Sequence, residues 1–244
     1  AAGALATGSL LGGAAIGVGA AAAVSLLHAA VCTRTRADHV VAGVALNLLV
    51  DAATIAALVS IHRTKGASPP FPDAMVETLS GTRVLGHVPL SWLALLAVPA
   101  VAFALGRTKW GLRVRAVGES PACAESLGVS AVRVRTTAVV VAGVLGGLAG
   151  VYLAFDVGSF SKHMAGGRGY LALACVVIGK WRPWTAAGAA LSFALLTALA
   201  NRLQVVERIP DEIPRMLPYA VTLVVLSGVV GRARPPAALG EATA

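Results

Sequence analysis

Long apolar runs separated by polar stretches constrain the fold of this chain more than any single motif. Counted along the sequence, the long runs are residues 4–31, 39–61, 89–106, 136–157, 185–203 and 216–230. Most are close to the roughly 20 residues that a helix needs to cross a bilayer. Of all residues, 57% are hydrophobic and 13% are charged, whereas a soluble domain carries about 25% charged residues. The sequence therefore predicts an all-α, polytopic helical membrane protein, because a β-barrel would show short alternating segments instead.

A seventh apolar segment, Tyr170 to Gly179, has only ten residues. As a helix it would be about 15 Å long, roughly half of a bilayer. It is either a half-helix that enters from the outer side, or it continues upward through Gly166 and Gly167. Discontinuous helices of this kind build substrate sites in transporters. We therefore expect a substrate path bordered by Met164, Gly167, Arg168 and Tyr170, and the alternative is a re-entrant packing element without a ligand.

A basic, mostly polar island lies between two of the runs, from Arg107 to Arg135. Its six basic residues are Arg107, Lys109, Arg113, Arg115, Arg133 and Arg135. Lys and Arg near span ends are retained in the cytoplasm, so the island predicts a cytoplasmic loop. The centre of the island has the signals of one short helix. Ser120 can cap its start, Pro121 suits the first helical position, and Gly128 suits the left-handed residue just past its end. This helix is either a handle for another protein or part of a solvated loop that only fixes topology.

The second apolar run contains two polar residues, Asn47 and Asp51. They are one helical turn apart and therefore share a face. Both would be costly in lipid, so we expect them to face the bundle interior or a wet cavity. They line a substrate path; alternatively, they hydrogen-bond a neighbouring helix, or Asp51 pairs with an arginine.

Small residues predict where two of the spans pack closely against other helices. The first run carries Gly13 and Gly17, and the fourth carries two overlapping small-xxx-small pairs, Gly143 with Gly147 and Gly146 with Gly150.

The chain has little that suggests catalysis or a bound cofactor. It lacks the glycine-rich lysine loop that cradles ATP phosphates, and its five histidines have no paired metal spacing. Three cysteines without a pairing pattern give no disulfide framework. The net charge of +9 comes from basic residues that flank apolar runs, which favours membrane topology over nucleic-acid binding. We expect no enzyme, no cofactor and no metal site.

Several stretches, in matching order, resemble bacterial ABC importer permeases of the branched-chain amino acid, sugar and nucleoside group. They are 42–49 (AGVALNLL), 111–122 (GLRVRAVGESPA) with Ala124 and 127–129, 164–174 (MAGGRGYLALA), 178–183 (IGKWRP), 216–223 (MLPYAVTL) and 231–240 (GRARPPAALG). The stretch at 111–129 resembles the whole group, whereas the other stretches look like the nucleoside-type permease.

The resemblance implies an ATP-driven importer with alternating access, located in the bacterial inner membrane. Its implied partners are an ABC ATPase, a second permease and an extracellular solute-binding lipoprotein, beside the lipid bilayer. The helix at 120–128 would be the coupling helix that seats in the ATPase. The residues matching that role are Gly118, Glu119, Ser120, Pro121, Ala122, Ala124 and Glu125. Residues 1–244 would then form a single transmembrane permease domain with its coupling loop at 107–135, and the family's N-terminal spans would be missing before residue 1.

This chain departs from the family pattern in two places. Ser120 stands where the family usually has Asn, and it can still cap the helix. Residues 165–169 (AGGRG) differ from the usual Thr-Ala-Gly-Arg-Gly, which bears on specificity. A sugar or a branched-chain amino acid is the alternative substrate. Outside the family, the alternative is a structural membrane subunit or a stand-alone carrier that uses Asp51 or Asp156.

Overall fold

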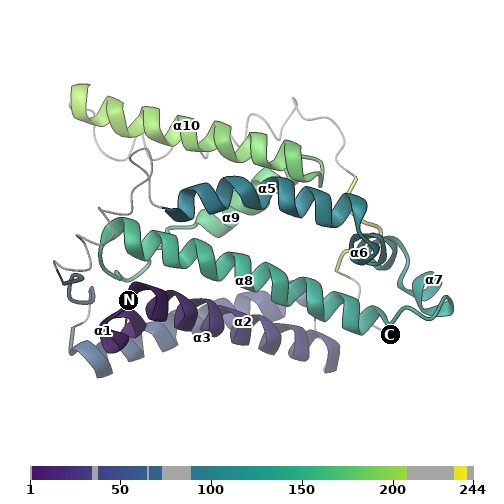
Figure 1. Ribbon diagram of the computed structural model, residues 1–244, viewed down its shortest axis with the longest axis horizontal. Helices are drawn as coiled ribbons and strands as arrows, with labels where there is room; N and C mark the ends of the chain where they lie inside the picture. Colours follow the sequence, from purple (N-terminus) through teal and green to yellow (C-terminus); the bar gives the residue numbers. More distant parts are fainter. Residues whose placement is uncertain (1, 35–37, 65, 73–88, 208–233, 241–244) are drawn as a thin grey trace. The chain divides into compact units, whose positions relative to one another are not determined.

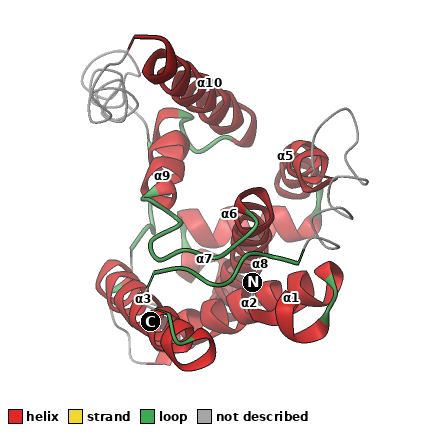
Figure 2. Cartoon of the chain, turned by 90° about the vertical axis from the view of Figure 1, so that its left-hand side faces the viewer, coloured by secondary structure: helices red, strands yellow, loops and turns green. Residues whose placement is uncertain are grey.

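The computed structural model describes residues 2–34, 38–64, 66–72, 89–207 and 234–240, which are mainly helical (Figures 1 and 2). The helices are α1 (Ala2–Thr7), α2 (Leu10–Arg34), α3 (His39–His62), α5 (Pro89–Arg107), α6 (Lys109–Glu119), α7 (Pro121–Ser126), α8 (Ala131–Val157), α9 (Arg168–Ile178) and α10 (Pro183–Glu207). In the part described, β pairing is confined to an isolated bridge between Ala67 and Ser161. The prediction of an all-α fold is confirmed.

Among the described residues, five helices are long and apolar enough to cross a membrane. Their candidate spans are Leu10–Thr33, His39–Ile61, Leu90–Arg107, Ala131–Val157 and Pro183–Ala200. The short seventh segment is α9, an apolar helix of 11 residues. The predicted span at 216–230 lies outside the described residues. The prediction of a multi-pass helical membrane protein is therefore confirmed.

The first span begins later than we predicted from the apolar run at 4–31. The run contains two helices, because α1 ends at Thr7 and α2 begins only at Leu10. Gly8 separates them with φ of +63°, a left-handed conformation that glycine adopts without steric cost. In α3, the start is fixed by Asp38, whose carboxylate accepts hydrogen bonds from the N–H groups of Val40 and Val41. The hydrogen bond from the Val41 N–H, followed by the one from the Val40 N–H, holds the pKa of Asp38 below its ordinary value.

The described chain forms two compact units. The first contains α1, α2, α3, the start of α5 to Leu95, α6, α7, α8 and the loop to Gly166, together with the chain from residue 237. The second contains the rest of α5 from Leu96, and the chain from Gly167 through α9 and α10.

The first unit is organised by the packing of α8 against α2 (Figure 1). Gly147 lies so close to α2 that a Cβ there would be 2.8 Å from Ala21 Cβ and 3.0 Å from Val18 Cα. At Gly143 a Cβ would collide with the Ser25 side chain. Gly146 and Gly150, in contrast, have open space around them. One of the two predicted small-residue pairs therefore forms the interface, and the other does not.

The predicted close approach at Gly13 and Gly17 is present on the opposite helix. Gly13 packs directly against Ala4 of α1. A Cβ at Gly17 would be 3.1 Å from Val151 of α8. Because both contacts involve small residues, the backbones of α1, α2 and α8 can approach closely.

Two connecting segments, 66–72 and 158–162, pair with each other beyond the end of α8. The Ser68 N–H donates to Phe160 C=O at 2.7 Å, and the Phe160 N–H donates to Ser68 Oγ at 3.0 Å. Phe71 packs edge-on against Phe155 of α8, with ring centroids 6.0 Å apart, beside Ala4 and Leu10. Residues 66–72, the first part of the long proline-rich connection, therefore pack across the C-terminal end of α8.

In the second unit, a tight corner joins α9 to α10. Lys180 and Trp181 both have positive φ, and the Thr185 hydroxyl donates to Gly179 C=O. Gly179 leaves no room for a side chain, because its Cα faces the backbone of Ala186. The corner turns the chain within four residues, so α9 packs against α10.

Candidate functional site

The short helix predicted in the basic island is present as α7, at the end of the first unit where α8 begins (Figure 1). The Ser120 hydroxyl accepts a hydrogen bond from the Cys123 N–H at 3.3 Å, and Pro121 is the first helical residue. The helix ends at Ser126, and Gly128 follows with φ of +79°. Each signal that predicted this helix therefore has its expected structural role.

The island nevertheless differs from our prediction of a loop with one helix. A second helix, α6, precedes α7, and the Thr108 hydroxyl caps it by accepting from the Gly111 N–H at 3.1 Å. Ser130 caps α8, which therefore begins at Ala131 rather than at residue 136. As a result, Arg133 and Arg135 belong to the membrane helix α8 and not to the loop. The sequence signals of these two helix starts are Thr108 and Ser130, whose hydroxyls suit the N-cap position.

One face of α7 is a packing face. Ala124 is 3% exposed and forms a small core with Val117 of α6 and Ala131 of α8. This core joins the three helices directly. Ala124, one of the predicted coupling residues, therefore lies in the attachment of α7 to the membrane helix and not on its accessible surface.

The other face of α7 is accessible. Glu119, Ala122 and Glu125 are exposed, whereas Ser120 and Pro121 are half-buried. Gly118 is held by the tail of the chain, because its C=O accepts a hydrogen bond from the Ala238 N–H at 3.0 Å. The predicted coupling residues thus divide into three exposed ones and four that hold the helix in place.

Sequence reasoning missed one residue of the exposed surface, Leu127. Its side chain is 83% exposed at the end of α7, in a segment that is polar and predicted to lie outside the membrane. We therefore add Leu127 to the exposed surface of α7 formed by Glu119, Ala122 and Glu125. The signal in the sequence is a lone leucine between Ser126 and the terminating Gly128.

Asn47 lines a cleft in the first unit, between α2, α3 and α8. The cleft has a volume of about 350 Å³, and its lining is Val24, Ser25, His28, Gly43, Leu46, Asn47, Val50 and Val139. Three of these side chains are polar: a hydroxyl, an imidazole and an amide. Apolar walls with a few convergent polar groups are typical of small-molecule sites, which have volumes of about 300–1,000 Å³.

Asp51 pairs with a histidine in a loop, and not with a neighbouring helix or an arginine as the alternatives to a substrate path predicted. Its carboxylate Oδ1 lies 3.3 Å from Nδ1 of His163, in the loop that follows α8. Neither a neighbouring helix nor an arginine is its partner in this pair. Met164 lies next to His163 in the same loop, and its N–H donates to Ser161 C=O at 3.1 Å. The structure therefore brings Asp51 and this part of the loop together.

Gly167, Arg168 and Tyr170 lie at the start of α9, in the second unit. Gly167 has φ of +77° and precedes the helix without a side-chain cap. Gly166 also has positive φ, so α9 does not continue upward through the two glycines and is a half-helix. The N–H groups of Tyr170 and Leu171 both donate to Gly167 C=O. Tyr170 itself is 69% exposed.

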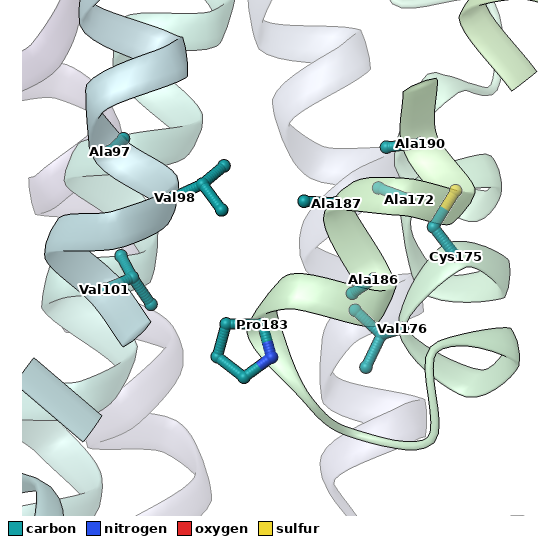
Figure 3. A pocket seen from close by; sticks show the side chains of 10 residues that line it. All are labelled: Ala97, Val98, Val101, Ala172, Cys175, Val176, Pro183, Ala186, Ala187 and Ala190. Atoms are coloured by element: carbon teal, nitrogen blue, oxygen red, sulfur yellow. The ribbon is translucent and has the colours of Figure 1, made fainter. Parts of the chain in front are cut away.

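A cleft in the second unit is apolar throughout. It has a volume of about 310 Å³ and lies between Val98 and Val101 of α5 and the helices α9 and α10, as Figure 3 shows. Alanines dominate the remainder of the lining, with Cys175 and Pro183. Because it offers a polar solute almost no hydrogen-bonding group, the cleft with Asn47 is the better candidate for a solute site.

Comparisons with known proteins agree with the resemblance in the sequence. A family model described as the permease component of branched-chain amino acid transport systems matches residues 1–226. The guanosine ABC transporter permease protein NupQ of Bacillus subtilis is 36% identical over 91% of this chain and 73% of its own length. The nucleoside ABC transporter permease protein NupC of Lactococcus lactis is 34% identical over 95% of this chain and 76% of its own length. No solved structure matches significantly.

Proposed function

We propose that this chain, which belongs to the family of branched-chain amino acid transport system permease components, carries nucleosides inward across the bacterial inner membrane. It is a permease subunit of an ABC importer and not itself an enzyme. The nucleoside assignment is supported by two relatives, one named as a guanosine permease and one as a nucleoside permease.

The proposal depends on one observation: the short helix α7 lies outside the candidate spans and packs directly against the start of α8. Its core of Ala124, Val117 and Ala131 couples any displacement of α7 to the start of α8. Further along, α8 packs on α2 through Gly143 and Gly147, and α2 lines the cleft that contains Asn47. A cytoplasmic ATPase that pulls on Glu119, Ala122 and Glu125 would therefore reshape the cleft and drive alternating access.

The α2–α3–α8 cleft supplies hydrogen-bonding groups that suit a nucleoside. The Asn47 amide both donates and accepts, as the edges of a nucleobase and the ribose hydroxyls require. His28 adds a ring nitrogen and a flat aromatic surface. In the same unit, Asp51 contacts His163 in the loop that contains Met164, so we include Met164 in the proposed substrate path. Within the second unit, we propose Gly167, Arg168 and Tyr170 at the start of α9 as further residues that meet the solute.

The family implies an ATPase and a solute-binding protein as partners. We assign the exposed face of α7 to the ATPase, and we place a second permease subunit and an extracellular binding lipoprotein in the same complex. We assign both compact units to a single transmembrane permease domain, residues 1–244.

Uptake into proteoliposomes that contain the complex with its ATPase and binding protein tests the proposal. We expect ATP-dependent uptake of guanosine or other nucleosides, and none of leucine or ribose. The variant N47A should reduce uptake, whereas L48A, an exposed neighbour on α3 (65% exposed), should not.

Three results would count against the proposal. Uptake of leucine or ribose alone would contradict the substrate, and equal uptake by N47A and L48A would contradict the site. Uptake that continues without ATP hydrolysis would instead favour a stand-alone carrier.

A further inference from the structure

Three metal-binding side chains meet where α2 ends and α3 begins. They are His28 and Cys32 of α2 and His39, the first residue of α3. One ligand atom from each residue lies within 4.8 Å of the others. Cys32 Sγ is 3.8 Å from Nε2 and 4.0 Å from Nδ1 of His28. The spacing of histidines alone did not reveal this cluster, because one ligand is a cysteine and another comes from the next helix.

The local structure explains why the three groups converge. His28 and Cys32 are four residues apart, so they lie on one face of α2, one turn above the other. The cap formed by Asp38 starts α3 immediately afterwards and fixes the position of His39. The two histidines are half-buried and Cys32 is 2% exposed, so the sulfur is shielded while the imidazoles are reachable.

The distances suit a zinc ion. Tetrahedral zinc, with Zn–S of about 2.3 Å and Zn–N of about 2.0–2.1 Å, places its S and N ligands roughly 3.5 Å apart and its N ligands roughly 3.4 Å apart. The atoms must therefore approach one another by roughly 1.4 Å at most, starting from the separations of up to 4.8 Å in this structure. Two imidazoles and a thiolate are borderline and soft ligands, which favour Zn²⁺ over Mg²⁺.

We propose that His28, Cys32 and His39 bind one Zn²⁺ ion, with water in the fourth position. On binding, Cys32 loses its thiol proton to solvent and coordinates as the thiolate. Asp38 adds a negative charge beside His39, but its carboxylate is engaged by the N–H groups of Val40 and Val41 and is not a ligand.

A bound ion has a consequence for transport, and this part rests on the proposed function. It ties the adjoining ends of α2 and α3 together. Because His28 also lines the α2–α3–α8 cleft, coordination removes a ring nitrogen from the solute site. We therefore expect Zn²⁺ to inhibit uptake.

Metal binding to the purified chain tests the site independently of transport. Zinc content after dialysis should be one ion per chain, and Co²⁺ in its place should give the thiolate-to-cobalt charge-transfer absorption. C32S should abolish that absorption and weaken Zn²⁺ binding by more than the roughly 10- to 100-fold typical of losing an outer-shell partner. C175S, at a cysteine that is also buried, should change neither, and Mg²⁺ should not compete.

The variants H28Q and H39Q give a second measurement if C32S is poorly folded, as judged by helical circular dichroism. Each should weaken Zn²⁺ binding while the chain remains helical. The proposal is overturned if the wild-type chain holds no stoichiometric zinc, or if C32S and C175S behave alike. Zinc binding without inhibition of nucleoside uptake would overturn only the consequence for transport.

Discussion

The carboxylate of Asp51 and the imidazole of His163, 3.3 Å apart, join the middle of a spanning helix to the loop after α8. Asp51 lies about midway along the 24 residues of α3. A loop residue that contacts it must therefore reach back toward the centre of that span. The loop after α8 is thus held against the middle of α3 by this contact.

The first prediction concerns this pair. His163 and Asp51 are 61% and 44% exposed at their side chains, so we expect a modest coupling of about 0.2–1 kcal/mol. The single variants D51A and H163A and the double variant form a double-mutant cycle in the free energy of unfolding in detergent. As a control, D156A, at an exposed carboxylate near the end of α8, should be additive with H163A. Additivity of D51A with H163A would show that the pair contributes nothing.

The second prediction concerns the accessible surface of α7. L127E and A122E place a charge on an exposed face that we assign to the ATPase, so transport-coupled ATP hydrolysis should fall while the chain remains in the membrane. The helix itself should be unaffected, because neither side chain is buried. L112E, at another exposed leucine (61%) on α6, is the matched control and should retain coupling. Full coupling in both α7 variants would rule out this face.

The third prediction contrasts two glycines of α8. In G147A the new methyl group meets Ala21 and the backbone of Val18 at 2.8–3.0 Å, so the helices must separate at a cost of about 1–3 kcal/mol. In G150A the methyl group meets open space, and the gain in helix propensity is up to about 1 kcal/mol. Thermal unfolding of the purified chain should therefore shift in opposite directions. A shift of equal sign and size would contradict the observed interface.

The fourth prediction concerns the cap of α7. S120A removes the hydroxyl that accepts from the Cys123 N–H, a loss typically worth about 1 kcal/mol. Hydrogen exchange at the first amides of α7 should accelerate about fivefold, since 1.4 kcal/mol corresponds to tenfold. S120N supplies another capping side chain and should exchange like the wild type. If S120A exchanges no faster than S120N, the cap does not stabilise this helix.

Much of the architecture was predictable because it depends on local properties of the sequence. Hydropathy located the five spans that lie in the described residues, and the residues Ser120, Pro121 and Gly128 located α7. Thr108 and Ser130 carry the same kind of cap signal for α6 and for the start of α8, neither of which the predicted loop included. Of the glycine pairs in α8, sequence could not tell which faces α2, because both have the same spacing.

The contacts around the candidate site were not predictable from the sequence alone. The pairing of Asp51 with His163 depends on how the chain reverses after α8, over more than 100 intervening residues. The cluster of His28, Cys32 and His39 forms across two helices. Such contacts are set by tertiary packing, whereas periodicity and caps report only on neighbours along the chain.

The proposed function requires that α7 lies on the cytoplasmic side and binds the ATPase. Cys123 allows both requirements to be measured directly. Cys123 is exposed on α7, whereas Cys32 and Cys175 are buried, so a membrane-impermeant maleimide should report on this helix. We predict labelling in inside-out vesicles, loss of that labelling in C123S, and protection of Cys123 when the ATPase is bound. Labelling of Cys123 in sealed right-side-out vesicles, or no protection by the bound ATPase, would contradict the account.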